Sequence, residues 1–258
     1  MQSLLEEYVL SQIVLYMLVF CRVGTTVMIM PGVGDGFINP NVRLIFAVAL
    51  SVVMAPVISP LIPTWDGNAA SLVWMMVTEI LIGFFIGTVA KIFMAALDTG
   101  GMLVSMNLGL GNAQVFNPQM ASQGSIMGAF LSITGGVLLF STNLHHMLIF
   151  GVVESYHTFP AGGDIPLVEG MASTIVQSVS KSFAIGFYMA VPFLVVSLFL
   201  YIAMGVLGRL MPQIQVFVLA LPLQITLGLL TLLLCFSTMM LFWLNHYDEA
   251  IQMFFRKL

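Results

Sequence analysis

Charged side chains are scarce in this sequence. Only 7% of its 258 residues are Asp, Glu, Lys or Arg, against about 25% in ordinary soluble domains. A further 60% are hydrophobic, which indicates an integral membrane protein. The few charges sum to −4, and this balance argues against a polybasic surface for anionic lipid head groups or for nucleic acid.

Side chains that bind metal ions are also few. Cys21 and Cys235 lie in apolar segments without CxxC spacing, so we interpret both as small buried hydrophobic residues. His145 and His146 are adjacent, and neighbours on a helix point about 100° apart, so they would need further ligands from elsewhere to hold one ion. We interpret them as interfacial residues near a helix end and expect neither a metal nor another cofactor.

The basic residues do not indicate how the protein is oriented in the membrane. None occurs between Lys91 and Lys181, and those of the loops and the C-terminal tail divide two against two, so the positive-inside rule is silent. The N-terminal stretch "MQSLLEEYVLSQIV" carries two acids, and the first basic residue is Arg22. We therefore expect no cleaved signal peptide.

Long apolar runs dominate what is present. About 20 helical residues cross a bilayer core of about 30 Å. Six such spans can be drawn, at about residues 8–30, 42–63, 70–97, 124–150, 172–207 and 214–244. The alternating ten-residue strands of a membrane β-barrel are not found. The sequence predicts an all-α membrane protein with about six long, partly broken hydrophobic helices in hairpins.

The spans are separated by segments dense in Gly, Pro, Asp and Asn, at 30–41, 63–68, 105–125, 152–170 and 208–213. Prolines also fall inside spans, among them Pro56, Pro192 and Pro222. Because proline removes a helical hydrogen bond, we expect kinks or protein-buried irregular turns there.

Four ionisable residues lie at apparent membrane depth: Arg22, Glu79, Lys91 and Asp98. Charges are costly in hydrocarbon, so these should face protein or water. Lys91 and Asp98 are two turns apart on one helix face and could share a partner. Glu79 lies on the same side as Gly83 and Gly87, whose "GFFIG" spacing lets helix backbones approach closely. We predict buried pairing that supports folding or assembly, with a proton relay as the alternative.

The string "GVGD" at 32–35 matches the GxGD motif of intramembrane aspartyl proteases. That chemistry needs a second aspartate facing the first, but the Tyr247-Asp248 pair lies at the C-terminal end, in the wrong order. Asp35 is better interpreted as a turn residue. GxSxG, HExxH and phosphate-binding glycine loops are absent from the sequence, so we predict that the protein is not an enzyme.

Two long stretches resemble the FliR family of flagellar biosynthesis and type III export-gate subunits. They are "EILIGFFIGTVAKIFMAALDTGGMLVSMNLGLGNAQVFNP" (79–118) and the more specific "GRLMPQIQVFVLALPLQITLGL" (208–229). "NVRLIFAVALSVVMAP" (41–56) and "YHTFPAGG" (156–163) fall at matching places, so the resemblance covers nearly the whole chain. Injectisome relatives share the fold and much of the pattern. The 208–229 run and the short tail favour the flagellar branch.

The resemblance implies that one copy closes a helical assembly with several FliP and FliQ copies, forming the pore through which unfolded proteins leave the cytoplasm. It places this assembly in the bacterial inner membrane at the flagellar basal body, partly raised toward the periplasm. Residues 1–171 would be FliP-like and 172–258 a FliQ-like hairpin and tail. The turn on the cytoplasmic side, in contact with FlhB and in reach of FlhA, would include Arg209, Pro212, Gln213 and Gln215.

An export pore must be sealed when idle, and the resemblance implies that residues 106–122 form the seal. The glycines give this uncharged loop backbone freedom, and its apolar side chains can close a pore by excluding water. The residues expected to form the plug are Met106, Leu108, Gly109, Leu110, Gly111, Phe116, Asn117, Pro118 and Met120. Many relatives have Asp-Pro where this sequence has Asn117-Pro118, so a possible charge is lost here.

A secondary transporter is the remaining alternative. It would bind a small solute near the membrane midplane through Glu79 or Lys91, beside broken helices. Such transporters are built from internal repeats, and the two halves of this sequence show no convincing repeat.

Overall fold

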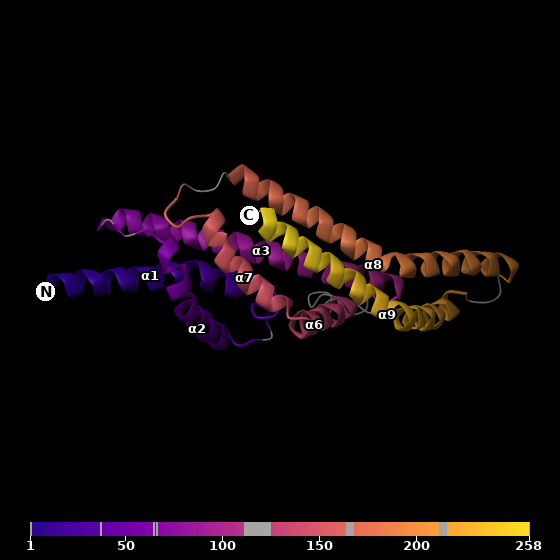
Figure 1. The fold of residues 1–258 in the computed structure, drawn as a ribbon. Helices are drawn as coiled ribbons and strands as arrows, with labels where there is room; N and C mark the ends of the chain where they lie inside the picture. The colour runs from indigo at the N-terminus through magenta and orange to yellow at the C-terminus, as the bar shows by residue number, and fades with distance from the viewer. Residues whose placement is uncertain are drawn as a thin grey trace. The chain divides into compact units, whose positions relative to one another are not determined.

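The computed structural model describes residues 2–36, 38–63, 65, 67–110, 125–163, 168–211 and 216–257. Within these ranges the chain is helical and contains no β-strand (Figure 1). The helices are α1 (Gln2–Ile29), α2 (Pro40–Ile58), the 3-10 turn η1 (Ser59–Leu61), α3 (Ala69–Asn107), α6 (Ile126–Ser141), α7 (Leu144–Thr158), α8 (Val168–Leu210) and α9 (Val216–Lys257). The expected all-α class is confirmed.

Five helices are long and apolar enough to cross a membrane, and α6 with α7 can add a sixth, bent span. The five stretches are Tyr8–Ile29, Pro40–Leu61, Ala69–Asn107, Gly170–Leu210 and Ala220–Phe254. This agrees with the six spans expected from hydropathy and confirms a multi-span membrane protein.

The third helix differs from the expectation because it continues ten residues beyond 97, through the pair Gly100 and Gly101. These glycines allow close packing instead of making a turn. A Cβ on Gly100 would lie 3.0 Å from the carbonyl oxygen of Gly186, and one on Gly101 would overlap the backbone of Gly128. Small residues in such positions let helices meet backbone to backbone.

Three other boundaries differ as well. The segment expected as a loop from 152 begins as the second half of α7, which ends at Thr158, and α9 continues to Lys257 instead of ending near 244. The expected span 124–150 is interrupted by Asn143, which has φ 60° and separates α6 from α7. Asparagine adopts this left-handed conformation more readily than most residues, so a local backbone preference breaks an otherwise apolar run.

The prolines inside the spans do not end their helices. Pro56, Pro192 and Pro222 lie within α2, α8 and α9. Each lacks the backbone N–H that would bond to the preceding turn. The irregular turns allowed for at these positions are therefore not found, and the helical backbone tolerates the missing donors.

The chain divides into two compact units. Unit 1 comprises residues 1–92, 139–178 and 249–258, and it buries Leu18 and Ile58 completely. Unit 2 comprises residues 93–138 and 179–248, and its core includes Trp243, whose indole N–H donates to the carbonyl of Phe93 over 3.2 Å. The long helices α3, α8 and α9 contribute to both units.

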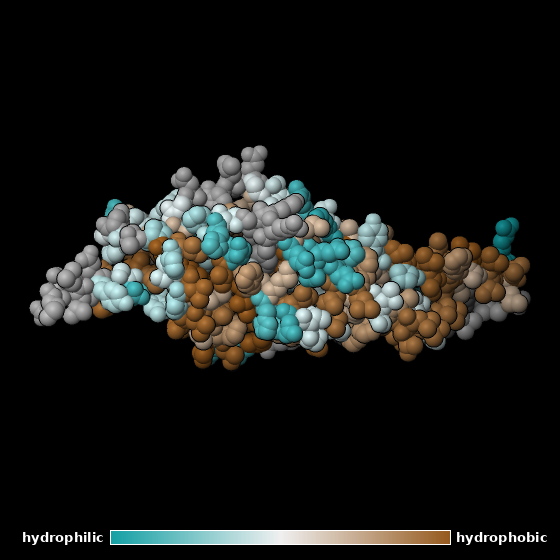
Figure 2. Space-filling model, viewed as in Figure 1, coloured by the Kyte–Doolittle hydropathy of each residue, from teal (hydrophilic) through white to brown (hydrophobic). Residues whose placement is uncertain are grey.

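Much of the outer surface is hydrophobic (Figure 2). On α2, Ile45 and Val53 are 68% and 71% exposed, and on α9 Leu233 and Leu234 are 76% and 70% exposed. Contiguous apolar surface of this kind marks faces that a membrane or another protein covers. Both α2 and α9 therefore present faces suited to lipid or to partner helices.

Candidate functional site

A buried ion pair joins α1 to α3 in unit 1. Arg22 Nε donates to Glu79 Oε2 over 2.7 Å, and Arg22 Nη2 donates to Glu79 Oε1 over 2.8 Å. Both side chains are completely buried. This two-pronged geometry is the strongest form of a charge-assisted hydrogen bond. The structure thus pairs two of the four ionisable residues that the sequence places at membrane depth.

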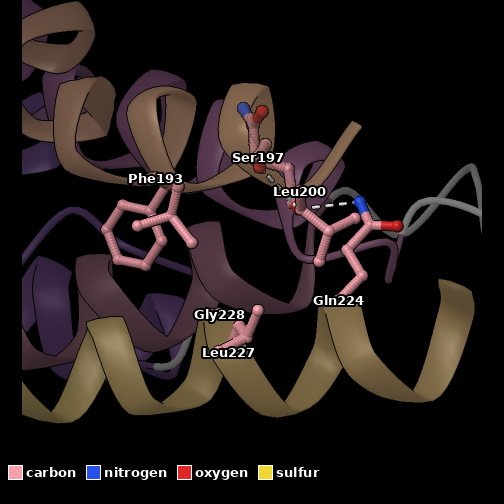
Figure 3. A pocket seen from close by; sticks show the side chains of 8 residues that line it. Phe193, Ser197, Leu200, Gln224, Leu227 and Gly228 are labelled. Carbon is pink, nitrogen blue, oxygen red and sulfur yellow. Dashed lines mark hydrogen bonds between the residues drawn. The ribbon is translucent and has the colours of Figure 1, made fainter. Parts of the chain in front are cut away.

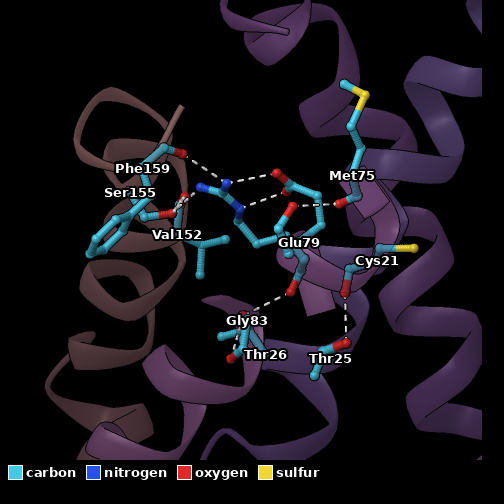
Figure 4. Close-up of polar contacts among 11 residues, drawn as sticks. Cys21, Thr25, Thr26, Met75, Glu79, Gly83, Val152, Ser155 and Phe159 are labelled. Carbon is cyan, nitrogen blue, oxygen red and sulfur yellow. Dashed lines mark hydrogen bonds and ion pairs between the residues drawn. The ribbon is translucent and has the colours of Figure 1, made fainter. Parts of the chain in front are cut away.

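Helix α7 completes the surroundings of Arg22 (Figure 4). Nη1 donates to the hydroxyl of Ser155 over 3.1 Å, and Nη2 donates to the carbonyl of Phe159 over 2.8 Å. The guanidinium carbon lies 3.8 Å from the ring centroid of Tyr156, in a cation–π contact. We call these four residues, together with Glu79, the Arg22 cluster. It ties three helices together around one charge.

The paired glycines of α3 explain how α1 comes so near. A Cβ on Gly83 would overlap the carbonyl oxygen of Arg22, and one on Gly87 would lie 2.9 Å from Cβ of Ile29. The hydroxyl of Thr26 donates to the carbonyl of Gly83 over 3.1 Å, so the two backbones are also bridged directly. The "GFFIG" spacing therefore places α3 against α1 within the same chain.

Lys91 and Asp98 lie farther along α3 than Glu79, and their side chains differ in exposure from the buried Arg22–Glu79 pair. For both, burial in pairs between helices or between subunits was predicted, and within the single chain both side chains are exposed. Asp98 accepts a short hydrogen bond from the hydroxyl of Ser132 on α6. Pairing of Lys91 or Asp98 with another subunit stays a prediction.

The residues considered for catalysis or metal binding take structural positions. Asp35 accepts a hydrogen bond from the backbone N–H of Gly32 over 2.8 Å, which closes the turn after α1. His145 and His146 lie in the first turn of α7, with their ring centroids 4.2 Å apart. Among the described residues, no group of three or more His, Cys, Asp or Glu side chains could hold a metal ion.

The stem of the expected plug has a defined structure in unit 2. Beyond the last turn of α3, the N–H of Gly109 donates to the carbonyl of Met106 over 3.2 Å, and the N–H of Leu110 donates to that of Ser105 over 3.1 Å. Gly109 has φ 74°. These bonds and the left-handed glycine are those of a Schellman motif, which caps a helix C-terminus. Gly109 therefore ends α3, whereas the sequence suggested that it gives the loop freedom.

The side chains of this stem face different surroundings. Met106 is 59% exposed, and Leu110 is half-buried. Leu108 is completely buried, and a Cβ added to Gly228 of α9 would overlap its side chain. Leu108 was predicted to help close a pore, and in this structure its side chain packs against α9. The remaining plug candidates Gly111, Phe116, Asn117, Pro118 and Met120 lie outside the described residues.

Polar side chains of α8 and α9 meet the last carbonyl of α3 (Figure 3). The amide of Gln224 donates to the Asn107 carbonyl over 2.8 Å and to the hydroxyl oxygen of Tyr201 over 3.1 Å. Ser197 donates its hydroxyl to the same Asn107 carbonyl over 3.2 Å. Because the last four carbonyls of a helix lack intrahelical partners, these contacts satisfy one of them.

Sequence reasoning missed Gln224, Ser197 and Gly228. A signal was present for two of them, since Gln224 interrupts the apolar run "FVLALPLQITLGLL" and Gly228 follows one helical turn later. It also missed the α7 residues around Arg22, because their segment was read as a loop. For the expected cytoplasmic-side turn, Arg209 lies exposed in the last turn of α8. Pro212, Gln213 and Gln215 lie outside the described residues.

Comparison with known proteins gives a consistent assignment. The family described as "Bacterial export proteins, family 1" matches residues 13–250. The flagellar biosynthetic protein FliR of Caulobacter vibrioides is 38% identical over 94% of this chain and 96% of its own length, and that of Bacillus subtilis is 29% identical over 92% of each chain. Yop proteins translocation protein T of Yersinia pestis is 28% identical over 73% of this chain and 71% of its own length. The chain therefore belongs to the family of bacterial export proteins that includes the flagellar FliR proteins.

Proposed function

We propose that this protein is a subunit of the flagellar type III protein export gate, where it helps to form and seal the pore for unfolded substrates. The observation that carries the proposal is the match to the Caulobacter vibrioides FliR protein, which is 38% identical and covers 94% of this chain. The described architecture of long apolar helices suits a pore-forming role in a membrane. Such a role needs positioning and sealing by the chain and no catalytic chemistry.

The seal is proposed to lie in residues 106–122, between α3 and α6. The segment has no charged residue, so it can close an idle pore by excluding water without binding one substrate sequence tightly. The cap at Gly109 and the burial of Leu108 support dividing this segment into a stem and a sealing part. Residues up to Gly109 would be a stem, and the apolar side chains of Leu110, Phe116 and Met120 would do the sealing.

Deleting residues 111–116 tests this role directly. We expect the complex to assemble normally and the ion conductance of the idle inner membrane to rise, because the apolar obstruction is shortened while the cap of α3 remains. The measurement is ion leak in cells or in proteoliposomes that carry the purified gate. Unchanged conductance with normal assembly would contradict the sealing role.

The proposed partners are FliP and FliQ within one hetero-oligomer, FlhB and FlhA beside it, and membrane lipid around it, in the bacterial inner membrane. The exposed apolar faces of α2, α8 and α9 support extensive helix contacts of this kind. The FliP-like and FliQ-like division at residue 171 and the cytoplasmic-side turn around Arg209 are parts of the same proposal. Co-purification with FliP and FliQ from a detergent extract tests it, and a chain that purifies alone would contradict it.

An injectisome gate is the second candidate, because the chain also matches Yop proteins translocation protein T. That match has lower identity and covers less of the chain than the match to the Caulobacter FliR protein. We therefore favour the flagellar role. Restored swimming in a strain lacking its own FliR would support that choice, whereas restored secretion only in an injectisome strain would reverse it.

A further inference from the structure

Gln224 lies in an apolar stretch of α9 and is only 7% exposed. An amide in such a position is costly unless its polar atoms are hydrogen-bonded. Its nitrogen donates to the Asn107 carbonyl over 2.8 Å and to the Tyr201 hydroxyl oxygen over 3.1 Å. The side chain thus reaches both α3 and α8 from its place on α9.

Ser197 adds a second donor to the same atom of α3, at 3.2 Å. A carbonyl oxygen has two lone pairs, so the Asn107 carbonyl can accept from both side chains at once. Two helices that are far apart in sequence from α3 therefore hold its final turn at one point. We call Asn107, Leu108, Gly109, Ser197, Gln224 and Gly228 the Asn107 cluster.

Apolar packing reinforces this contact one residue later. Leu108 is completely buried, and its side chain fills the space that a Cβ on Gly228 would need. Gly109 has φ 74°, and a Cβ there would lie 3.2 Å from the amide carbon of Gln224. Any larger residue at 109 would therefore disturb the cap of α3 and the side chain that holds it.

A cavity beside these residues is too small to take the side chain of Leu108. A cavity of about 10 Å³ lies among Asn107, Gln224 and apolar side chains of α8 and α9, including Phe193 and Leu227. Such a volume holds about one water molecule. A leucine side chain does not fit into this cavity.

We propose that the Asn107 cluster is a fixed joint of the gate. By this we mean that its contacts among α3, α8 and α9 stay formed while a substrate passes. The inference rests on the proposed export function and adds a positioning residue to it. Gln224 acts through the Asn107 carbonyl and sets where the chain leaves α3. The joint ends at Gly109, so the chain up to that residue does not move during export.

A disulfide across the joint tests whether it must open. A Cβ on Gly228 would lie 3.5 Å from Cα of Leu108, which is compatible with a bridge between Leu108→Cys and Gly228→Cys. The pair is placed in a full-length gate in which Cys21 and Cys235 are changed to Ser. We expect the oxidised and reduced complexes to export substrate at rates within about twofold. Reversible loss of export on oxidation, absent from Leu108→Cys alone, would overturn the proposal.

Removing the amide tests the positioning role. Gln224→Met keeps the length of the side chain and removes its donors. The matched control is Thr226→Val on the same helix, because the Thr226 side chain is exposed and its hydroxyl donates to the Pro222 carbonyl one turn away. We expect Gln224→Met to raise the idle ion leak about tenfold relative to the control, equivalent to about 1.4 kcal/mol, with gate assembly unchanged on a native gel.

The deletion of residues 111–116 distinguishes a failure of the joint from a failure of the sealing role. If that deletion raises the leak and Gln224→Met does not, the joint is refuted while the export function stands. If the deletion itself leaves the leak unchanged, the sealing function fails. A tenfold rise with Gln224→Met, together with normal export by the cross-linked gate, supports the joint.

Discussion

The Arg22 cluster and the Asn107 cluster each hold three helices together, but they do so by different physical means. The first uses a full positive charge that is completely buried, bonded to a carboxylate and stacked on an aromatic ring. The second uses neutral hydrogen bonds and one leucine packed against a glycine. A buried charge is strongly destabilising once its partner is lost, whereas a neutral hydrogen bond contributes about 1 kcal/mol. We therefore expect loss of the Arg22 cluster to impair folding more than loss of the Asn107 cluster.

Glu79→Gln should have the largest effect. It leaves Arg22 buried without a negative partner, and breaking such a pair costs about 3–5 kcal/mol. We expect severe loss of assembled gate complex, measured on native gels, and a smaller loss of export per assembled gate. Asp98→Asn, on the same helix but exposed, should assemble normally. Normal assembly of Glu79→Gln with abolished export would instead favour a proton relay.

Gly83→Ala should come next, because its Cβ would overlap the carbonyl oxygen of Arg22. Overpacking of this kind costs about 1–3 kcal/mol, so we expect a lower midpoint in thermal unfolding of the purified complex. Gly205→Ala on α8 is the matched control, since a Cβ there meets nothing within 4 Å. Equal midpoints for the two variants would show that α1 and α3 do not approach as described.

Gly109→Ala should disturb the Asn107 cluster more mildly. The left-handed conformation costs a non-glycine residue about 1–2 kcal/mol, and the new Cβ would also press on Gln224. We expect normal assembly with increased ion leak. Gly67→Ala separates the two causes, because Gly67 also has positive φ, at 82°, but has nothing within 4 Å of a Cβ. A similar leak in both variants would remove the contact with Gln224 from the explanation.

Lys91→Gln should have the smallest effect on the stability of the chain. The side chain is exposed, and surface substitutions away from special features change stability by less than about 0.5 kcal/mol. We expect unchanged thermal unfolding of the purified chain. A large destabilisation would mean that the charge is held within the chain after all, as the sequence had suggested.

The helices were largely predictable because apolar runs and their breaks are local properties of the sequence. The end of α3 was not, since Gly100 and Gly101 resemble a turn in sequence and are explained only by the backbones packed against them. Glu79 and the "GFFIG" glycines could be singled out because charge and small-residue spacing are visible along one helix. The role of Ser155 could not, because only tertiary packing brings it to Arg22, 133 residues away.

The break at Asn143 has a consequence for the parity of membrane crossings. At 16 and 15 residues, α6 and α7 are each about 22–24 Å long, shorter than the hydrocarbon core of about 30 Å. Neither crosses alone, so the pair contributes one crossing when bent through the membrane and none when it returns to the side it entered. If the five long apolar helices each cross, one further crossing makes the total even and puts the start of α1 and the end of α9 on the same side of the membrane, whereas none makes it odd and puts them on opposite sides. The path of the chain at the Asn143 bend therefore bears on which side α9 ends, in a sequence whose charges leave that choice open.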